Sequence, residues 1–203
     1  MANNLATLRT QLSLKLRDAT NATWSTGELD DILTQRAAQL WPRVGVNLTT
    51  DFTTIPYQES NSLPATFRSV HRVDVLDVTG LMEYTMPAGT WELRGTPGAY
   101  TLFVNRNYVL SGKTMRVFGY GVYDLVTTLP DDRFVPLILA QSASEALRRL
   151  IPDRAQFKKW LTRNQEQNVS VNELILMVNE ADAEAEKLYQ RAWTWKKPVP
   201  GRV

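Results

Sequence analysis

The chain has 203 residues, a formal net charge of +2, one histidine and no cysteine. The missing cysteines exclude a disulfide framework, a thiolate zinc site and a cysteine nucleophile, so any metal would need other ligands. There is no run of about 18 apolar residues that could span a bilayer, and the first residues lack the plan of a signal peptide, so we expect a protein made and assembled in a cytoplasm. The length suits one substantial core, or one core with a large insertion.

Two apolar stripes at three- and four-residue spacing indicate two helices near the start of the chain. The first covers residues 5–16. The second begins after Ser25, which forms a capping-box pattern with Glu28, and it ends at Pro42. We therefore expect residues 1–43 to form a helical hairpin with an apolar seam.

Residues 44–130 follow a β pattern instead. β-Branched residues are frequent, apolar and polar residues alternate, and most of the glycines of the chain separate short runs. Such spacing is typical of a small antiparallel sandwich or barrel. The expected strands cover residues 44–55, 67–78, 90–94, 99–105, 108–110 and 114–120.

Helical periodicity returns over residues 131–192. Asp131 and Asp132 are natural caps for a helix, and Pro136 falls in its first turn, where a missing amide is tolerated. This helix has the broadest apolar surface, so we expect it to be the most buried. Pro152 ends it.

Two further helices are expected after this break. The first covers residues 154–163, is basic, and is anchored by aromatic side chains. The second starts at another capping box, formed by Ser170 and Glu173, and carries an apolar stripe at three- and four-residue spacing. That stripe consists of Val171, Leu174, Val178, Ala181, Ala185, Leu188 and Ala192.

The expected fold class is therefore α+β. A discontinuous α-helical bundle, made of the N-terminal helical hairpin and the C-terminal helices, carries an inserted antiparallel β-sandwich or barrel-like module. The expected parts are the hairpin at 1–43, the β module at 44–130, the C-terminal helices at 131–192 and an extended C-terminal arm at 193–203.

No pattern of catalytic residues is present. His71 is alone between two arginines, and the carboxylate pairs lie in first turns of helices, where the helix dipole favours negative charge. The glycines Gly119 and Gly121 lack the lysine of a phosphate-binding loop, so they indicate a tight strand end. We expect no enzyme activity, no cofactor, and no catalytic, cofactor-binding or metal residues.

The charges are separated along the chain. The segment 148–163 is basic and contains Phe157 and Trp160, whereas 180–186 is acidic. The basic segment is compatible with a solvated helix face whose aromatics are core, with a nucleic-acid-binding patch, or with a head-to-tail contact between identical subunits. The candidate subunit-interface residues are Leu174, Val178, Ala181, Ala185, Leu188, Arg154, Lys158, Glu180 and Glu184, and the candidate DNA contacts are Arg148, Arg149, Lys159 and Arg163.

The C-terminal residues 193–203 contain two tryptophans, two prolines and no acid. Proline blocks further helix, so this segment should be extended. Tryptophan is an anchor residue at interfaces, which favours an arm that docks on a partner, with disorder or packing on its own chain as the alternative. The candidate arm residues are Trp193, Trp195, Lys196, Lys197, Pro198 and Arg202.

Several short patterns together resemble the head-to-tail adaptor (connector) proteins of tailed bacteriophages. These patterns are Trp24-Ser25-x-x-Glu28-Leu29 and Ala37-Ala38-Gln39-Leu40-Trp41 in the hairpin, Leu63-Pro64 before a valine-rich strand, Leu129-Pro130-Asp131 before an alanine-rich helix, and a late helix rich in glutamate and alanine. They are a sequence of elements rather than one signature motif, and they cover nearly the whole chain.

The resemblance implies a structural virion protein at the head–tail interface. Adaptors of this family form rings, typically dodecameric, that dock on the portal protein, extend the channel for genomic DNA and attach the next tail component. The resemblance also implies that the C-terminal arm binds the portal. It implies no catalytic residue, no cofactor and no membrane contact. The alternatives are another tail component, such as a stopper or tail-completion protein, and a sequence-independent nucleic-acid-binding module.

Overall fold

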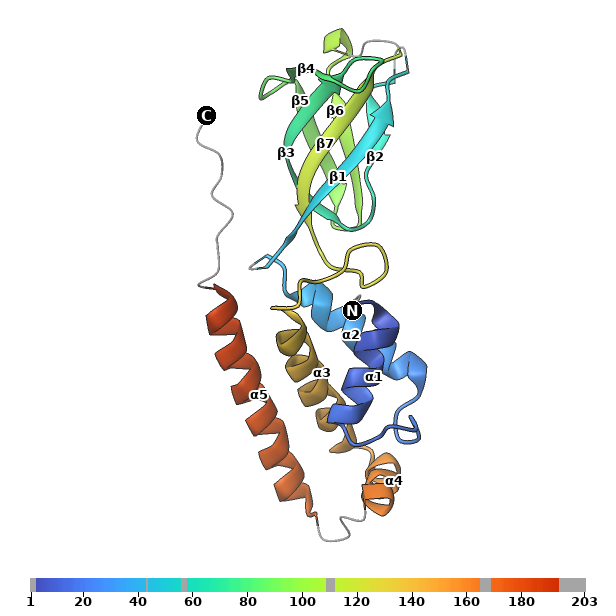
Figure 1. Cartoon of the computed structure of the whole chain (residues 1–203), viewed down its shortest axis with the longest axis vertical. Coiled ribbons are helices and arrows are strands. Elements are labelled where there is room, and N and C mark those ends of the chain that lie inside the picture. Colours follow the sequence, from blue (N-terminus) through green and yellow to red (C-terminus); the bar gives the residue numbers. More distant parts are fainter. Residues whose placement is uncertain (1–2, 43, 56–57, 109–111, 165–168, 194–203) are drawn as a thin grey trace. The chain divides into compact units, whose positions relative to one another are not determined.

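The computed structural model describes residues 3–42, 44–55, 58–108, 112–164 and 169–193. The chain divides into two compact units. One contains the helices and consists of Met1–Val44 and Tyr123–Val203, and the other, Gly45–Val122, contains the strands (Figure 1). The α+β class and the order of elements, with N-terminal helices, inserted strands and C-terminal helices, are confirmed.

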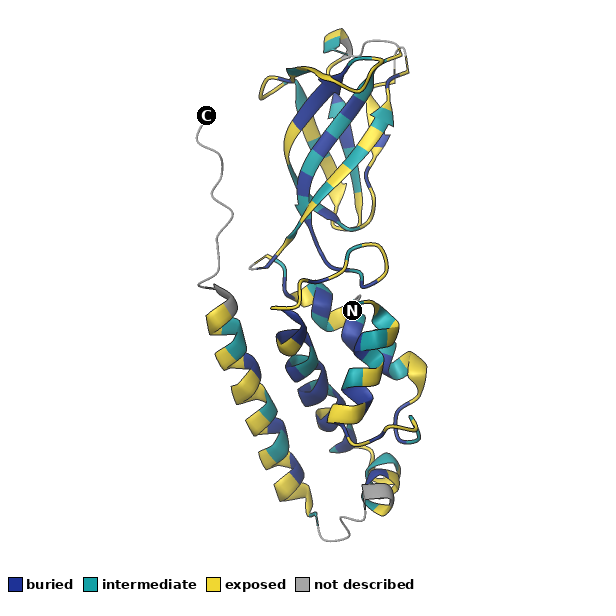
Figure 2. Ribbon diagram, viewed as in Figure 1, coloured by how far each residue is buried: buried dark blue, intermediate teal, exposed yellow. Residues whose placement is uncertain are grey.

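In the helical unit, α3 lies between α5 on one side and α1 and α2 on the other (Figure 1). Ten residues of α3 are buried, and Figure 2 shows this helix mostly dark blue, which confirms that it is the most buried helix of those described. The helices are α1 Leu5–Lys15, α2 Thr26–Gln39, α3 Val135–Leu150, α4 Arg154–Asn164 and α5 Val171–Trp193.

The start of α2 is confirmed by its capping box. The Ser25 amide donates to the Glu28 carboxylate at 2.7 Å, and the Glu28 amide donates to Ser25 Oγ at 3.2 Å. The connector before it covers residues 16–25. Its shape depends on the buried carboxylate of Asp18, which accepts hydrogen bonds from the amides of Thr23 at 2.8 Å and Trp24 at 3.1 Å.

The expected aspartate cap of α3 is wrong. The helix starts at Val135, and its N-cap residue is Phe134, which makes no side-chain capping bond. Asp131 and Asp132 come too early because a turn intervenes, in which the Phe134 amide donates to the Asp131 carbonyl at 2.9 Å. Asp132 instead accepts a hydrogen bond from the Asn3 side chain at 2.6 Å. Proline in the first turn of the helix is confirmed.

The strand unit consists of two antiparallel sheets with strand orders β1-β7-β3-β4 and β2-β6-β5. Alternate residues of β7 are buried, and the inward side chains of the two sheets form one apolar core that includes Val73, Leu102 and Val117. The strands are β1 Val46–Thr53, β2 Ser60–Ser62, β3 Phe67–Leu76, β4 Met82–Thr85, β5 Trp91–Thr96, β6 Ala99–Val104 and β7 Thr114–Gly121.

Two features of this unit differ from the expectations. The short strands β2 and β4 were not predicted from the sequence. The expected strand at 108–110 is wrong at Tyr108, which ends a 3-10 helix, Arg106–Tyr108, and its other residues lie outside the described ranges. Gly119 and Gly121 lie at the end of β7, as expected, and the Ser69 and Thr66 carbonyls leave no room there for a side chain.

Candidate functional site

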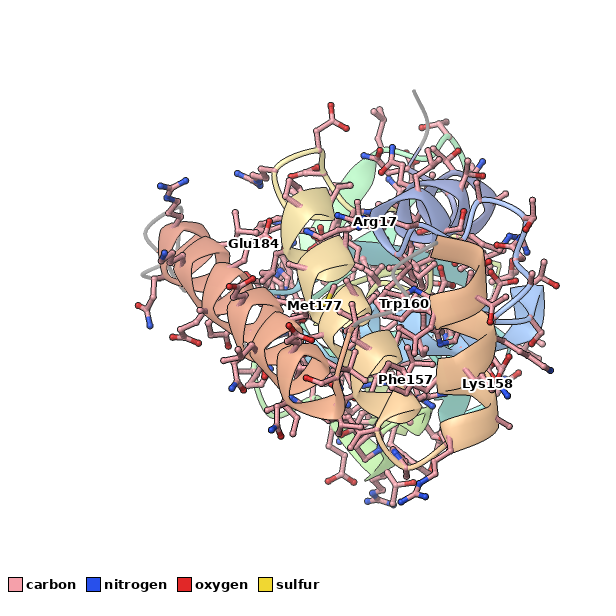
Figure 3. All side chains as sticks on the ribbon, turned by 90° about the horizontal axis from the view of Figure 1, so that it is seen from below. Arg17, Phe157, Lys158, Trp160, Met177 and Glu184 are labelled. Carbon is pink, nitrogen blue, oxygen red and sulfur yellow. The ribbon has the colours of Figure 1, made fainter. Side chains whose placement is uncertain are left out.

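The inner side of α5 packs on α3 within the same chain. Leu174, Val178 and Ala185 are 0%, 5% and 6% exposed, and Ala181 and Leu188 are half-buried beside them. Figure 3 shows Met177 on the same inner side, between α5 and α3. The role of this stripe as a subunit interface stays a prediction, but its residues already have a packing partner inside the chain.

Ion pairs join α3 to α5 and to α2. Arg148 Nη2 lies 2.7 Å from Asp182 Oδ2, and Ser144 Oγ donates a hydrogen bond to the same carboxylate. Arg149 Nε lies 3.2 Å from Glu145 Oε1. Two of the four candidate DNA contacts, Arg148 and Arg149, are therefore paired with carboxylates of their own chain.

The Glu145 carboxylate sits between two guanidinium groups. Its Oε2 atom lies 2.5 Å from Arg36 Nη2 of α2, in addition to the contact with Arg149. Partial burial by itself raises the pKa of Glu145, but the hydrogen bonds from Arg149 and Arg36 outweigh burial, so the pKa is lowered overall. The carboxylate stays charged and links α2 to α3.

The aromatic side chains of α4 are part of the core. Trp160 is 1% exposed, and its Nε1 donates to the Leu16 carbonyl at 3.1 Å, while Gln156 Nε2 donates to the Thr23 carbonyl at 2.9 Å. The rings of Phe157 and Trp160 stack with centroids 6.2 Å apart. These contacts fix α4 to the connector between α1 and α2. They agree with the interpretation in which the aromatic side chains of the basic segment belong to the core and its other face is solvated.

That solvated face of α4 is basic. Arg154, Lys158 and Lys159 are exposed, and none of the three forms an ion pair with another residue in the described ranges. Figure 3 shows Lys158 on the side of α4 away from Phe157 and Trp160. The side chain of Arg163, the fourth candidate DNA contact, lies outside the described residues.

Exposed apolar residues lie near the start of α5, and two of them, Ile175 and Leu176, turn away from the inner stripe. Val171, Ile175 and Leu176 are 45%, 39% and 59% exposed. Sequence reasoning treated Val171 as part of the inner stripe and missed the other two. The available signal was the unbroken apolar run 174–178, because five consecutive apolar residues surround a helix on every side and cannot all face α3.

The acidic residues of α5 have different surroundings. Glu184 Oε2 lies 2.9 Å from Lys15 Nζ, so this candidate interface residue is paired within the chain. Glu173 accepts a hydrogen bond from the Ser170 amide at 2.6 Å, which confirms the second capping box. Glu180 is exposed and has no ion-pair partner in the described part of the chain.

The remaining candidates belong to the strand unit or to the C-terminal arm. His71 stacks on Tyr120 at 4.7 Å in the strand unit, and burial together with the charge of Arg72 lowers its pKa. The side chain of Trp193 is not among those described. The other arm residues, Trp195, Lys196, Lys197, Pro198 and Arg202, lie outside the described ranges.

Among the described residues, no group of three or more histidine, aspartate or glutamate side chains could hold a metal ion. None of the described helices is long and apolar enough to cross a membrane.

No family model matches the chain, and no curated protein matches it significantly. Among solved structures, it is similar to a chain in the neck of an empty gene transfer agent particle computed with C6 symmetry, with 12% identity and a TM-score of 0.35 over 68% of this chain and 76% of that chain. It is also similar to a chain in the virion of a native gene transfer agent particle, with 14% identity and a TM-score of 0.35 over 70% of this chain and 76% of that one. Because both TM-scores are below 0.5, we draw no functional argument from these similarities.

Proposed function

We propose that this chain is a structural virion protein, a head-to-tail adaptor that forms a ring beneath the portal. The ring, dodecameric in the family that the chain resembles, extends the DNA channel and attaches the next tail component. The protein acts by binding other proteins and has no enzymatic step. Genomic DNA passes through the ring without sequence-specific contacts.

The observation that supports this proposal is the order of the elements. The adaptor family that the chain resembles includes larger versions in which a β module is inserted in the helical bundle. The chain has α1 and α2, then seven described strands, then α3 to α5 around one helical core. A bundle assembled from both ends of the chain suits a scaffold that must present several surfaces at once.

The C-terminal arm is the proposed contact with the portal. Its tryptophans supply anchor side chains and its lysines and arginine supply charge, which together suit insertion into a partner. Deleting Thr194–Val203 is expected to abolish binding to the portal while the helical content, measured by circular dichroism, stays unchanged. Unchanged binding would remove the arm from the proposal.

The whole proposal is tested with the purified chain and the portal protein of the same particle. Electron microscopy and mass photometry should show rings, and rings bound to portals. If neither is found, the adaptor function is wrong. Affinity for duplex DNA at low salt that falls steeply with added salt would favour the nucleic-acid-binding alternative instead. The ion pairs of Arg148 and Arg149 count against that alternative.

A further inference from the structure

We propose that the outer side of α5 binds the basic outer side of α4 in a second copy of this chain, so that copies associate head to tail. This inference deepens the proposed function and rests on it for the closure of the contacts into a ring. It moves the predicted subunit interface from the inner stripe of α5, which packs on α3, to the opposite side of the helix.

The first two turns of α5 offer an apolar surface that no other described residue covers. Ile175 and Leu176 are 39% and 59% exposed, although α5 packs on α3 along its other side. Clustered apolar residues at one end of a surface helix are typical of a protein contact.

Carboxylates border this apolar surface. Leu176 lies three residues after Glu173 and four before Glu180, so the three side chains are neighbours on one side of the helix. All three are exposed, and Glu180 has no ion-pair partner among the described residues. The partner that fits is an apolar surface bordered by positive charge.

The outer side of α4 supplies the positive charge, around one small apolar residue. Ala155 lies between Arg154 and the pair Lys158 and Lys159, which are its neighbours at three and four residues' distance, and all four are exposed. The small Ala155 leaves room for a leucine side chain. The aliphatic parts of the lysines can cover that leucine while their ammonium groups reach the glutamates.

The positions of the two surfaces favour a head-to-tail contact over a symmetric one. Figure 3 shows α5 and α4 on opposite sides of α3, with Phe157 and Trp160 turned inward from α4 and Lys158 on its far side. One chain can therefore use both surfaces at once, which produces a ring or a filament. A symmetric α5–α5 pair would instead bring the Glu180 carboxylates of two copies together.

Cross-linking tests this contact in the full chain, because the sequence has no cysteine of its own. Ala155→Cys on α4 and Asn172→Cys on α5, combined in one chain, should give a ladder of dimers, trimers and larger species with a short bismaleimide. A mixture of the two single variants should stop at dimers, and each single variant alone should stay monomeric on denaturing gels. The matched control combines Asn172→Cys with Ala6→Cys, an exposed position on α1, and should give no ladder.

Charge reversal provides the second arm of the test. Lys158→Glu with Lys159→Glu should lower the cross-linked fraction roughly tenfold, and adding Glu180→Lys should restore much of it, because like charges repel and opposite charges attract across the contact. Circular dichroism checks that each variant folds. A missing ladder, a ladder that charge reversal leaves unchanged, or cross-linking of Asn172→Cys to itself would each overturn the inference.

Different results would contradict the adaptor function and the contact between α4 and α5. Native rings that bind the portal without any α4–α5 cross-link would overturn this contact and leave the adaptor function standing. A charge-dependent ladder from a chain that never binds the portal would confirm the contact and contradict the adaptor function.

Discussion

At the scale of single residues, Asp124 holds together the loop before α3. Its Oδ1 atom accepts hydrogen bonds from the amides of Val126 at 2.9 Å and of Thr127 and Thr128 at 2.8 Å each. The neighbouring Leu125 has a φ of 62°, a left-handed conformation that costs a leucine about 1 kcal/mol or more. The carboxylate keeps the loop in this strained form.

Asp124→Asn should therefore destabilise the helical unit. The amide keeps one acceptor oxygen but loses the charge, so a loss of about 1–2 kcal/mol is expected in urea unfolding followed by circular dichroism. Asp31→Asn on the exposed side of α2 is the matched control and should change stability little. Equal effects of the two variants would show that the loop does not depend on the Asp124 charge.

The same carboxylate predicts a pH dependence. Partial burial alone raises the pKa of Asp124, but hydrogen bonds from Thr127, Thr128 and Val126 together lower it from 3.8 to about 2. Because the folded pKa lies below the unfolded one, the stabilisation is complete well above 3.8 and is lost as the pH falls towards 2. Unfolding free energies measured from about pH 5 downward should fall less steeply in Asp124→Asn than in the unaltered chain.

Trp160 anchors α4 to the connector between α1 and α2. Trp160→Phe keeps an aromatic ring but removes the donor to the Leu16 carbonyl, so we expect a loss of about 1–3 kcal/mol in urea unfolding. The comparison is Trp91→Phe in the strand unit, where Nε1 has no hydrogen-bond partner among the described residues. That variant loses no hydrogen bond and should cost less. A reversed order would argue against the Leu16 bond as the anchor.

At the scale of elements, β7 depends on glycine because of space. A Cβ atom at Gly119 would overlap the Ser69 carbonyl oxygen and come within 2.9 Å of the Phe67 ring. Gly119→Ala should therefore push β3 and β7 apart and cost about 2–4 kcal/mol, seen as lower thermal stability of the strand unit. Gly27→Ala is the control, since nothing lies within 4 Å of that site in α2, and it should stabilise by up to about 1 kcal/mol.

Local signals explain which elements were predictable. The capping boxes at Ser25 and Ser170 defined two helix starts correctly because the interaction spans only four residues. The start of α3 was misplaced because Asp131 and Asp132 have the right chemistry, and only tertiary contacts such as the one from Asn3 to Asp132 shift the helix start to Val135. The strand β2 is three residues long and exists through its pairing with β6, which no local pattern records.

The functional surfaces of α4 and α5 could be predicted only in part, because local patterns do not record which residues are neighbours in space. Periodicity identified the apolar stripe of α5, but it does not state whether α3 or another subunit covers that stripe. Charge clustering identified Arg148 and Lys158 together, although one is paired with Asp182 and the other has no ion-pair partner among the described residues. Spatial neighbours decide such differences, and the sequence alone does not supply them.

At the scale of the whole molecule, we expect the helical unit to fold without the strands. The first and last residues of the strand unit lie close together, because Val46 of β1 pairs with Gly121 of β7. Antiparallel partners lie about 5 Å apart, so a linker of a few glycines can replace residues 45–122 without forcing the ends of the helical unit apart. The α3 core, with its contacts to α1, α2 and α5, lies entirely in the remaining chain.

The chain without residues 45–122 should keep its helical circular dichroism signal. With Ala155→Cys and Asn172→Cys it should still form the cross-linked ladder, because the outer sides of α4 and α5 both belong to the helical unit. The same shortened chain with Asn172→Cys and Ala6→Cys, which has no cysteine on α4, is the control and should give no ladder. A helical unit that folds but no longer cross-links would place part of the contact between copies on the strands. A helical unit that fails to fold would mean that the two units are cooperative, and the full chain should then unfold in a single transition rather than two.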